Sequence, residues 1–392
     1  MTDYHILILG GGIVGLTLAN LLAPYHLNIA VLENAPLSPL EYNPCAYNSR
    51  VSACNRASEN IFRKIGIWES LAQTRLSAYK KMQIWSEKSN QKLLFDCLSI
   101  GEPNLGYIVE NNLLSFLLLK QLKQYAHVHF YTDFHAKEIN LSSNDGMLQN
   151  QDGKKIKFQL LVGADGKNSW IRKKLNFSIL EKDYEQQALI THIKTEKPHQ
   201  QTAYQRFLSS GPLAFLPLQD SHSCSIVWST DPTHAEILKT MNKENFELQL
   251  ATAFEDRLGE LQMIAPLLSF PLHFQHVKNY FKERVVLIGD AAHTIHPLAG
   301  LGLNLGLIDA EALSTHISHA LKNKRDFGLE KTLRAYELQQ KTNNTLTLHA
   351  INLLKNFFDT RHPLSSLSDL GLRLANRLPF IKNSFARYAL GI

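Results

Sequence analysis

The most informative stretch of the chain spans Tyr4 to Glu33 and reads YHILILGGGIVGLTLANLLAPYHLNIAVLE. Tyr4–Leu9 is an apolar run typical of a buried strand, and Leu16–Ala23 has the apolar spacing of a helix. A G-x-G-x-x-G pattern lies between them, and Leu27–Leu32 predicts a second strand. This order of strand, glycine turn, helix and strand indicates a dinucleotide-binding unit rather than a turn with a purely structural role.

Each residue of the pattern has its own expected task. Gly10 would make the tight turn, Gly12 would let backbone amides approach a pyrophosphate, and Gly15 would let the helix pack closely on the strand. The phosphates would lie at the positive end of the helix. Glu33 ends the second strand, where a carboxylate can accept both hydroxyls of an adenosine ribose and disfavours a 2′-phosphate.

Two later segments repeat the arrangement of an apolar strand that runs into a turn with one carboxylate. The first is Leu160–Gly166, whose Asp165 we expect in part to cap a helix over Ser169–Leu175. The second is Arg284–His293, which carries Asp290. We therefore expect the second segment to return the chain to the first lobe.

A glycine-rich segment follows the second carboxylate and precedes a long helix predicted near Leu307–Leu321. Its glycines would leave backbone amides free to meet a flat, electron-rich group at a helix N-terminus. These glycines are Gly300, Gly302 and Gly306. We interpret His293 and His296 as structural or supporting residues, because no acidic partners lie at metal-ligand spacing and no metal site is indicated.

The rest of the chain divides into mixed and strand-rich regions. Arg50 follows a loop rich in Pro and Asn, so it is either an exposed charge or a residue near the nucleotide site. Tyr107–Leu122 reads as a helix that opens with the polar trio Glu110-Asn111-Asn112. From Tyr184 to about Phe274 the pattern is strand-like, which predicts a second lobe of antiparallel sheet able to form the wall of a ligand cavity.

The composition limits the classes of protein that remain. At 392 residues the chain exceeds one core, and 44% hydrophobic and 19% charged residues are ordinary globular values. We expect no signal segment before the first strand, and no run approaches the roughly 18 apolar residues of a membrane span. The charge of +6 is dispersed, which disfavours a nucleic-acid partner. Four cysteines without a C-x-x-C pair indicate a reducing, cytoplasmic setting and neither a zinc site nor a disulfide framework: Cys45, Cys54, Cys97 and Cys224.

Three blocks of the sequence resemble a known class of enzymes. Gly10–Gly15, Gly163–Gly166 and Gly289–Asp290 are similar to the dinucleotide, DG and GD motifs of group A flavoprotein aromatic hydroxylases, the class that contains para-hydroxybenzoate hydroxylase. Longer blocks resemble the aerobic ubiquinone-biosynthesis hydroxylases, and most of all the 2-polyprenylphenol 6-hydroxylase branch. These blocks are Arg50–Ala53, Gln205–Phe207 with Gly211–Leu218, Cys224–Ser229, Gly289–Gly300 and Asp369–Leu372.

The resemblance implies an α/β fold with a Rossmann-like FAD-binding domain of the para-hydroxybenzoate hydroxylase type. The FAD-binding domain would comprise residues 1–75, 100–178 and 275–345. An inserted antiparallel-sheet substrate domain would comprise residues 76–99 and 179–274, and residues 346–392 would form a helical C-terminal segment.

The resemblance also assigns expected roles to individual residues. Gly10, Gly12 and Gly15 would hold the FAD pyrophosphate, and Glu33 would hold the adenosine ribose. Arg50 would lie near the flavin and pyrophosphate, Asp290 would bind the ribityl chain, and Asp165 would stabilise the fold around FAD and the approach of NAD(P)H. The residues expected beside the isoalloxazine are Pro297, Gly300, Gly302, Leu303 and Asn304. Leu301 stands where the family usually has Gln.

The implied reaction is hydroxylation of a polyprenylphenol intermediate of ubiquinone biosynthesis, at C5 of the ring, with non-covalently bound FAD and with NAD(P)H and O2 as co-substrates. A flavin C4a-hydroperoxide would transfer its distal oxygen, so no catalytic side chain is assigned. A sister hydroxylase acting at another ring position is the nearest alternative. An FAD-dependent reductase similar to the geranylgeranyl reductases and a non-catalytic partner of a biosynthetic complex also stay open.

The C-terminal tail predicts two amphipathic helices separated by His362-Pro363. We expect the first, over Leu346–Phe357, to pack on the FAD lobe. For Leu367–Ile392 two interpretations stay open: a core element, or a docking element for anionic lipid or an assembly partner, since a polyprenylphenol is nearly insoluble in water. A ubiquinone-biosynthesis complex, a homo-oligomer and a peripheral position at the inner membrane are all compatible with this expectation.

Overall fold

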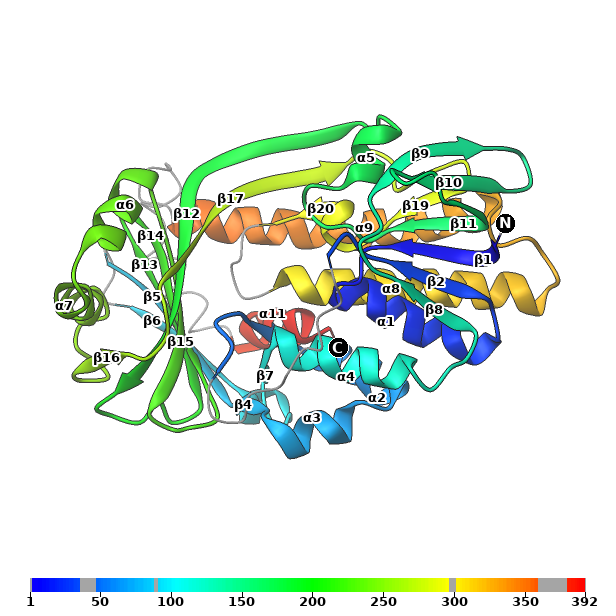
Figure 1. Cartoon of the computed structure of the whole chain (residues 1–392). Coiled ribbons are helices and arrows are strands. Elements are labelled where there is room, and N and C mark those ends of the chain that lie inside the picture. Colours follow the sequence, from blue (N-terminus) through cyan, green and yellow to red (C-terminus); the bar gives the residue numbers. More distant parts are fainter. Residues whose placement is uncertain (1, 36–46, 88–90, 296–300, 359–378, 392) are drawn as a thin grey trace.

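The computed structural model describes residues 2–35, 47–87, 91–295, 301–358 and 379–391. Two lobes lie side by side, each built around its own sheet (Figure 1). A smaller sheet of three strands completes the architecture. The predicted α/β class, with a Rossmann-like lobe and a second lobe of largely antiparallel sheet, is confirmed. None of the helices within the described ranges is long and apolar enough to cross a membrane.

The first lobe contains a mainly parallel sheet whose central strands are apolar throughout, because both faces are covered. Ile6, Leu7 and Ile8 in the middle of the sheet are fully buried. Across the sheet the strands are β18 (Phe281–Lys282), β19 (Val285–Leu287), β11 (Lys155–Gly163), β1 (Thr2–Leu9), β2 (Ile29–Leu32) and β8 (Val128–Tyr131). An antiparallel hairpin of β9 (Ala136–Leu141) and β10 (Gly146–Asn150) continues from β11.

Long helices cover the first sheet. The helix α1 (Ile13–Leu22) packs against both α4 (Asn111–Leu122) and α8 (Leu301–Lys322), and all three lie below the sheet in Figure 1. The helix α9 (Glu330–Phe358) packs on α8. The short helix η1 (Ala23–Tyr25) ends α1.

The small sheet corrects one prediction. Tyr107–Glu110 belongs to strand β7 (Gly106–Glu110) and not to a helix, which begins only at Asn111. Gly106 has a φ of 139°, and β7 forms backbone pairs on both sides. The partners of β7 are β3 (Val51–Cys54) and β4 (Ser77–Tyr79), and the helices α2 (Arg56–Ile65) and α3 (Trp68–Thr74) follow β3.

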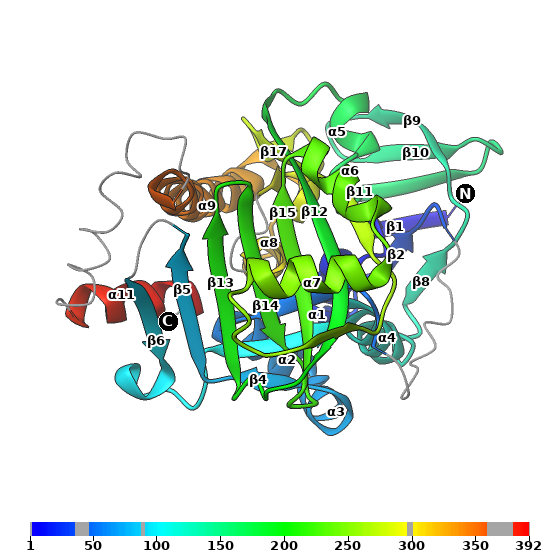
Figure 2. The ribbon, with the colours of Figure 1, turned by 90° about the vertical axis from the view of Figure 1, so that its left-hand side faces the viewer.

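The second lobe is a large sheet in which one neighbouring pair, β13 with β5, is parallel. In spatial order its strands are β20 (His293–Thr294), β17 (Leu268–Val277), β12 (Ile179–Thr195), β15 (Ser223–Thr230), β14 (Gly211–Pro217), β13 (Thr202–Leu208), β5 (Lys81–Ser86) and β6 (Lys92–Asp96), with β16 (Leu261–Met263) beside β12. Its outer face packs on α6 (Pro232–Thr240) and α7 (Lys243–Ala253), as both views show (Figures 1 and 2).

The sequence analysis did not predict α6 and α7. Both helices begin with an N-cap residue that the sequence shows. Asp231 caps α6 and Asn242 caps α7, and each side chain accepts a hydrogen bond from a first-turn amide. The two helices bury Trp228 and other apolar residues of the outer face, which leaves the inner face of the sheet turned toward the first lobe.

A long two-stranded ribbon joins the lobes along the top of Figure 1. β12 pairs with β17 from Ile179 opposite Val277 to Ile190 opposite Leu268. The register shifts between Asp183 and Gln186, so the ribbon carries a bulge at this point.

The C-terminal region is only partly described. The predicted helix over Leu346–Phe357 is the continuation of α9, and the stretch Leu367–Leu378 lies outside the described residues. The helix α11 (Pro379–Leu390) packs on β6 and on η2 (Cys97–Ile100) of the second lobe. Lys382 and Arg387 donate to the carbonyl oxygens of Leu94 and Ile100, at 3.1 and 2.8 Å.

Candidate functional site

Four strands bring the predicted motifs to one edge of the first sheet. Neighbouring parallel strands β19, β11, β1 and β2 all end at the same edge. The turns that follow them carry, in spatial order, Asp290, Asp165, Gly10–Gly15 and Glu33. Segments far apart in sequence therefore form one continuous line across the carboxyl edge, where ligands of open α/β sheets bind.

The three glycines of the first turn differ in what surrounds them. A Cβ at Gly10 would overlap the backbone of Ala164, and Gly10 has a φ of 116°. A Cβ at Gly15 would overlap the carbonyl oxygen of Gly10. At Gly12, by contrast, a Cβ would meet no atom within 4 Å in the part of the chain that the structure describes. Gly10 and Gly15 are therefore needed for packing, while Gly12 leaves open space in front of the N-terminus of α1.

The carboxylate of Glu33 is fixed next to this turn. Its Oε2 accepts from the backbone N–H of Gly11 at 2.7 Å, and its Oε1 accepts from that of Asn34 at 2.9 Å. Glu33 is half-buried, so its remaining lone pairs are available to a ligand hydroxyl.

Asp165 holds the start of the helix α5 (Trp170–Lys174). Its Oδ2 accepts from the backbone N–H groups of Trp170 and Ile171, at 2.6 and 3.2 Å. Ser169 is the N-cap residue and accepts from the Arg172 amide at 3.0 Å. Burial raises the pKa of the Asp165 carboxyl although these hydrogen bonds oppose the shift. Its Oδ1 is buried and has no hydrogen-bond partner within the described ranges.

Asp290 lies in the short helix η3 (Gly289–Ala291) and is solvent-exposed at the carboxyl edge. Desolvation by the surrounding protein raises the pKa of its carboxyl. The charges of His293, Arg50 and Lys167 act in the opposite direction. Arg50 also lies over the ring of Phe270 on β17, at 5.3 Å. Arg50 thus lies between the acid of the first lobe and the sheet of the second.

A buried hydrogen-bond network below η3 was not predicted from the sequence. Asp309 of α8 is fully buried, and its Oδ2 accepts from the backbone N–H of Gly289 at 2.9 Å and from His293 Nε2 at 2.6 Å. Its Oδ1 accepts from Gln340 at 2.7 Å and from Asn344 at 3.3 Å. The network ties both ends of the Asp290 turn to α8 and α9.

Two histidines near this network have pKa values shifted in opposite directions. Burial opposes protonation of His293, but the Asp309 carboxylate outweighs burial and raises the pKa of His293. Burial, helped by the charges of His293 and Lys341, lowers the pKa of His276 to about 4. His276 Nε2 lies 2.9 Å from the hydroxyl oxygen of Tyr280.

The residues expected beside the ring system are only partly described. Pro297 and Gly300 lie outside the described residues. Gly302, Leu303 and Asn304 lie in the first turn of α8, which begins at Leu301 and not near Leu307 as predicted. The first-turn amides of an α-helix lack intrahelical partners.

Two residues of this helix, Gly306 and Asn304, contact neighbouring elements of the protein. Gly306 lies beyond the first turn, and a Cβ there would come within 2.7 Å of Val14 Cγ2, so its glycine is explained by packing. The side chain of Asn304 is engaged in the protein: Oδ1 accepts from Asn55 N at 3.0 Å, and Nδ2 donates to Ala53 O at 2.8 Å.

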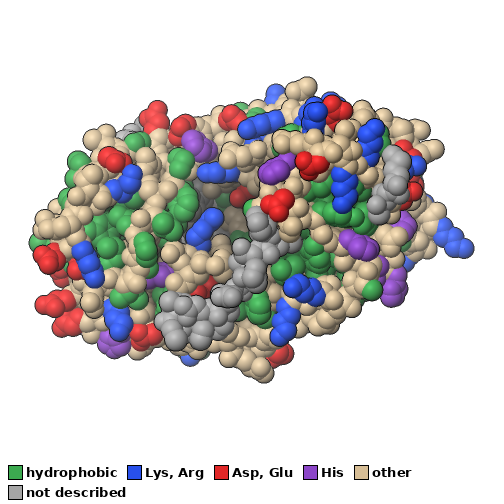
Figure 3. Space-filling model, in the orientation of Figure 1, with side chains coloured by type: hydrophobic (Ala, Val, Ile, Leu, Met, Phe, Trp, Pro, Cys, Tyr) green, Lys and Arg blue, Asp and Glu red, His purple; other side chains and the backbone are tan. Residues whose placement is uncertain are grey.

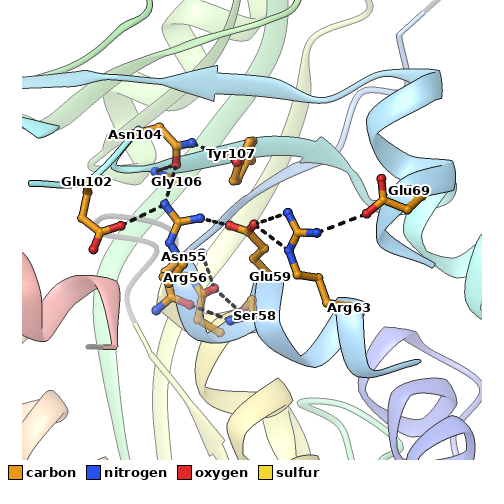
Figure 4. A network of polar contacts seen from close by, with 11 residues as sticks. Asn55, Arg56, Ser58, Glu59, Arg63, Glu69, Glu102, Asn104, Gly106 and Tyr107 are labelled. Atoms are coloured by element: carbon orange, nitrogen blue, oxygen red, sulfur yellow. Dashed lines mark hydrogen bonds and ion pairs between the residues drawn. The ribbon is translucent and has the colours of Figure 1, made fainter. Parts of the chain in front are cut away.

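A charged network fixes α2, the element that follows the Arg50 segment. Figure 4 shows Glu59 between Arg56 and Arg63, and the Glu59 side chain is almost fully buried. Arg56 also reaches Glu102 at 3.2 Å, and Arg63 reaches Glu69 at 3.1 Å. The network supports the N-terminus of α2, where Asn55 joins Asn304.

Arg172 is a second residue that the sequence analysis missed. It is buried and donates to the carbonyl oxygens of Ala291, at 2.9 Å, and Lys167. It also donates to Gln275 Oε1 of β17 at 3.0 Å. It therefore connects the turns that carry Asp165 and Asp290. Its position on a short helix that directly follows Asp165 could have indicated this role.

The two lobes enclose a hollow, which the space-filling view shows with lysine and arginine side chains near its rim (Figure 3). On the side of the first lobe, the carboxyl edge offers amides that can bind an anion and carboxylates that can accept from hydroxyl groups. On the other side lies the inner face of the second sheet. It can hold a dinucleotide along the carboxyl edge and a second ligand against the sheet.

Comparisons with known proteins agree with this geometry. The family model described as "FAD binding domain" matches residues 3–343. The mitochondrial ubiquinone biosynthesis monooxygenase COQ6 of Xenopus tropicalis is 32% identical over 435 residues, covering 98% of this chain and 93% of that protein. The 3-demethoxyubiquinol 3-hydroxylase of Escherichia coli K12 is 32% identical over 391 residues, covering 99% of this chain and 98% of that protein.

Among solved structures, P. aeruginosa PqsL in complex with 2-aminobenzoylacetate is similar to this chain, with a TM-score of 0.79. The sequence identity is 19%, and the match covers 95% of this chain and 99% of that one. At this identity the similarity establishes a shared fold.

Proposed function

Because this chain belongs to the FAD-dependent hydroxylases of ubiquinone biosynthesis, we propose that it hydroxylates the aromatic ring of a polyprenylphenol at ring carbon 5. The chain is an FAD-dependent aromatic monooxygenase. The substrate and the ring position are the proposal. The observation that supports it most is the line of four motif turns at one sheet edge, opposite the inner face of the second sheet.

The residues at the carboxyl edge are suited to FAD. The open space at Gly12 admits a pyrophosphate to the N-terminus of α1, because no atom of the described residues occupies it. Glu33 is held where it can accept ribose hydroxyls. Asp290 is exposed at the far end of the same line, where it can accept from the ribityl chain.

When bound, FAD supplies electron transfer from NAD(P)H and the activation of O2 for oxygen transfer to an electron-rich ring. The protein has to bind the phenol, orient its ring and exclude water. The apolar side chains on the inner face of the second sheet, among them Ile190, Leu216 and Val227, are suited to the last two tasks. Arg50, placed between Asp290 and Phe270, would close one side of the same space.

The second candidate is hydroxylation at another ring position. It is favoured by the E. coli relative, which aligns with nearly the whole of this chain and is named for the hydroxylation of 3-demethoxyubiquinol. The two candidates share the fold, the cofactor and the chemistry, and they differ in which intermediate enters the hollow.

Profiling of quinone intermediates in cells that lack this protein separates the candidates. A hydroxylase of carbon 5 predicts accumulation of the polyprenylphenol that lacks the C5 oxygen. The alternative predicts accumulation of 3-demethoxyubiquinol. Unchanged ubiquinone and no accumulated intermediate would contradict both, provided that no second hydroxylase is expressed.

A further inference from the structure

Several buried polar atoms on the second sheet have no hydrogen-bond partner among the described residues, and two of them belong to residues paired across neighbouring strands. These two are Nδ1 of His192 on β12 and Oγ of Ser225 on β15. The two residues are 1% and 0% exposed, and they lie directly opposite one another in the β12–β15 pairing. Buried polar groups are rarely left unpaired because doing so costs free energy, so two of them at one place indicate a ligand.

The contacts of His192 show which ring nitrogen carries the hydrogen of the neutral imidazole. Nε2 lies 2.7 Å from the carbonyl oxygen of Asn48, which can only accept, so Nε2 carries the hydrogen. Burial lowers the pKa of His192, which keeps the imidazole neutral. Nδ1 is therefore a bare acceptor. Ser225 adds a hydroxyl that can donate.

The surroundings of this pair are largely apolar, and the ring of Tyr47 lies 6.0 Å from that of His192. Alternation along the strands places Ile190, Val227 and Leu216 on the same face as His192 and Ser225. Ile190 lies opposite Val227, and Leu216 lies opposite Ser225. All three apolar residues are half-buried, whereas Ile226 on the other face is buried beneath α6 and α7. Solvent thus reaches the sheet within one residue of the pair.

The same face approaches the cofactor edge. Asn48, the partner of His192, lies two residues before Arg50. Arg50 contacts Phe270, which pairs with Ala188 on β12. The pair and the cofactor-side arginine therefore belong to one surface.

We propose that His192 and Ser225 form the binding site for the hydroxyl group of the phenolic ring. The phenol O–H donates to His192 Nδ1, and the phenol oxygen accepts from Ser225 Oγ. This inference rests on the proposed function and adds the residues that recognise the substrate. Donation of the phenol hydrogen to nitrogen raises the electron density of the ring, which oxygen transfer requires.

Matched variants separate this role from a merely structural one. Asn places its amide near the position of Nδ1, whereas the longer Gln reaches the position of Nε2. His192→Gln thus keeps the bond to Asn48 O and loses the Nδ1 acceptor, and His192→Asn does the reverse. Ser225→Ala removes only an atom without a partner, so we expect its unfolding temperature to match or exceed that of the parent protein.

The test measures dissociation constants from the change in flavin absorbance, with 2-geranylphenol and its methyl ether as probes on FAD-loaded protein. We expect His192→Gln and Ser225→Ala to weaken binding of the phenol by about tenfold each. In His192→Gln, binding of the ether, which cannot donate, should change less than twofold. Ser225→Ala should weaken binding of both probes, because the ether oxygen can still accept from Ser225 Oγ. His192→Asn should bind the phenol within about threefold of the parent protein.

Two results would overturn the inference and leave the proposed function standing. One is unchanged phenol affinity in both His192→Gln and Ser225→Ala while the parent protein hydroxylates the phenol. The other is equal loss for phenol and ether in His192→Asn with no loss in His192→Gln, which would make His192 an anchor for Asn48. A parent protein that neither binds nor hydroxylates the phenol would overturn the proposed function together with this site.

Discussion

A methyl group at Gly12 would enter open space, whereas one at Gly15 would overlap the backbone of Gly10. We therefore expect Gly12→Ala to keep the unfolding temperature of the FAD-free protein and to weaken FAD binding at least about tenfold, because the added methyl occupies ligand space. Gly15→Ala should lower the unfolding temperature even without FAD. Calorimetry and FAD titration test both. Normal FAD affinity in Gly12→Ala would contradict the proposed position of the pyrophosphate.

His276 gives the protein a sensitivity to acid. Its pKa is about 4 in the folded protein, against roughly 6.5 for an unperturbed histidine. Between these values the unfolded chain binds more protons, so the stability contributed by neutral His276 is complete above pH 6.5 and is lost as the pH falls toward 4.

We accordingly expect His276→Gln, which can keep a hydrogen bond to Tyr280, to reduce the loss of stability between pH 7 and pH 5. Urea unfolding at the two pH values measures the difference. The exposed His319 provides the control variant, His319→Gln, which should behave like the parent protein. An unchanged pH dependence in His276→Gln would show that another group is responsible.

At the level of single residues, the sequence predicted those site residues that belong to a short motif. Gly10, Gly15 and Glu33 stand at fixed distances from strand ends, so their places could be predicted. Asp309 could not, because its partners come from η3, β20 and α9, which only the tertiary fold brings together. A lone carboxylate on the apolar face of a helix was the available signal.

At the level of elements, the errors arose where local pattern and tertiary pairing disagree. Tyr107–Glu110 fits a helical spacing, but β3 and β4 on either side supply its backbone partners. The start of α8 was placed too late because its glycines suggested a loop, although Gly306 is required by packing against Val14. The helices α6 and α7 were hidden among strand-like runs, since the outer face that they cover is not apparent from alternation alone.

The helix α11 provides a prediction at this scale. Ala386 and Leu390 are buried in a cluster with Leu93 and Phe95. Ala386→Asp buries an unpaired charge and should lower the free energy of unfolding by about 3 kcal/mol. The exposed Ser384 on the same helix supplies the control, Ser384→Asp, which should have little effect. Chemical denaturation measures both.

A different result for Ala386→Asp would favour the other interpretation of the tail. Unchanged stability together with reduced ubiquinone synthesis in cells would contradict the core role of α11. It would support the proposal that Leu367–Ile392 docks on anionic lipid or on an assembly partner. Cations such as Lys382 and Arg387 donate to backbone carbonyls of the protein itself, which favours the core role.

At the scale of the whole molecule, the order of motifs along the chain predicted the architecture well. Three strand-to-turn units belong to one parallel sheet, and strand-rich residues between them form the inserted lobe. The meeting of the two lobes could not be predicted, because it depends on the β12–β17 ribbon and on contacts such as Arg50 with Phe270. These contacts create the hollow in which the proposed reaction takes place.

The most direct test of the central claim is isotope incorporation during turnover. Purified FAD-loaded protein would be supplied with NAD(P)H, 2-geranylphenol and ¹⁸O2, and the product would be analysed by mass spectrometry. We expect a ring-hydroxylated product that carries one ¹⁸O atom, together with substrate-dependent consumption of NAD(P)H. Oxidation of NAD(P)H with reduction of the prenyl chain and no ¹⁸O in the ring would contradict a hydroxylase and identify a reductase.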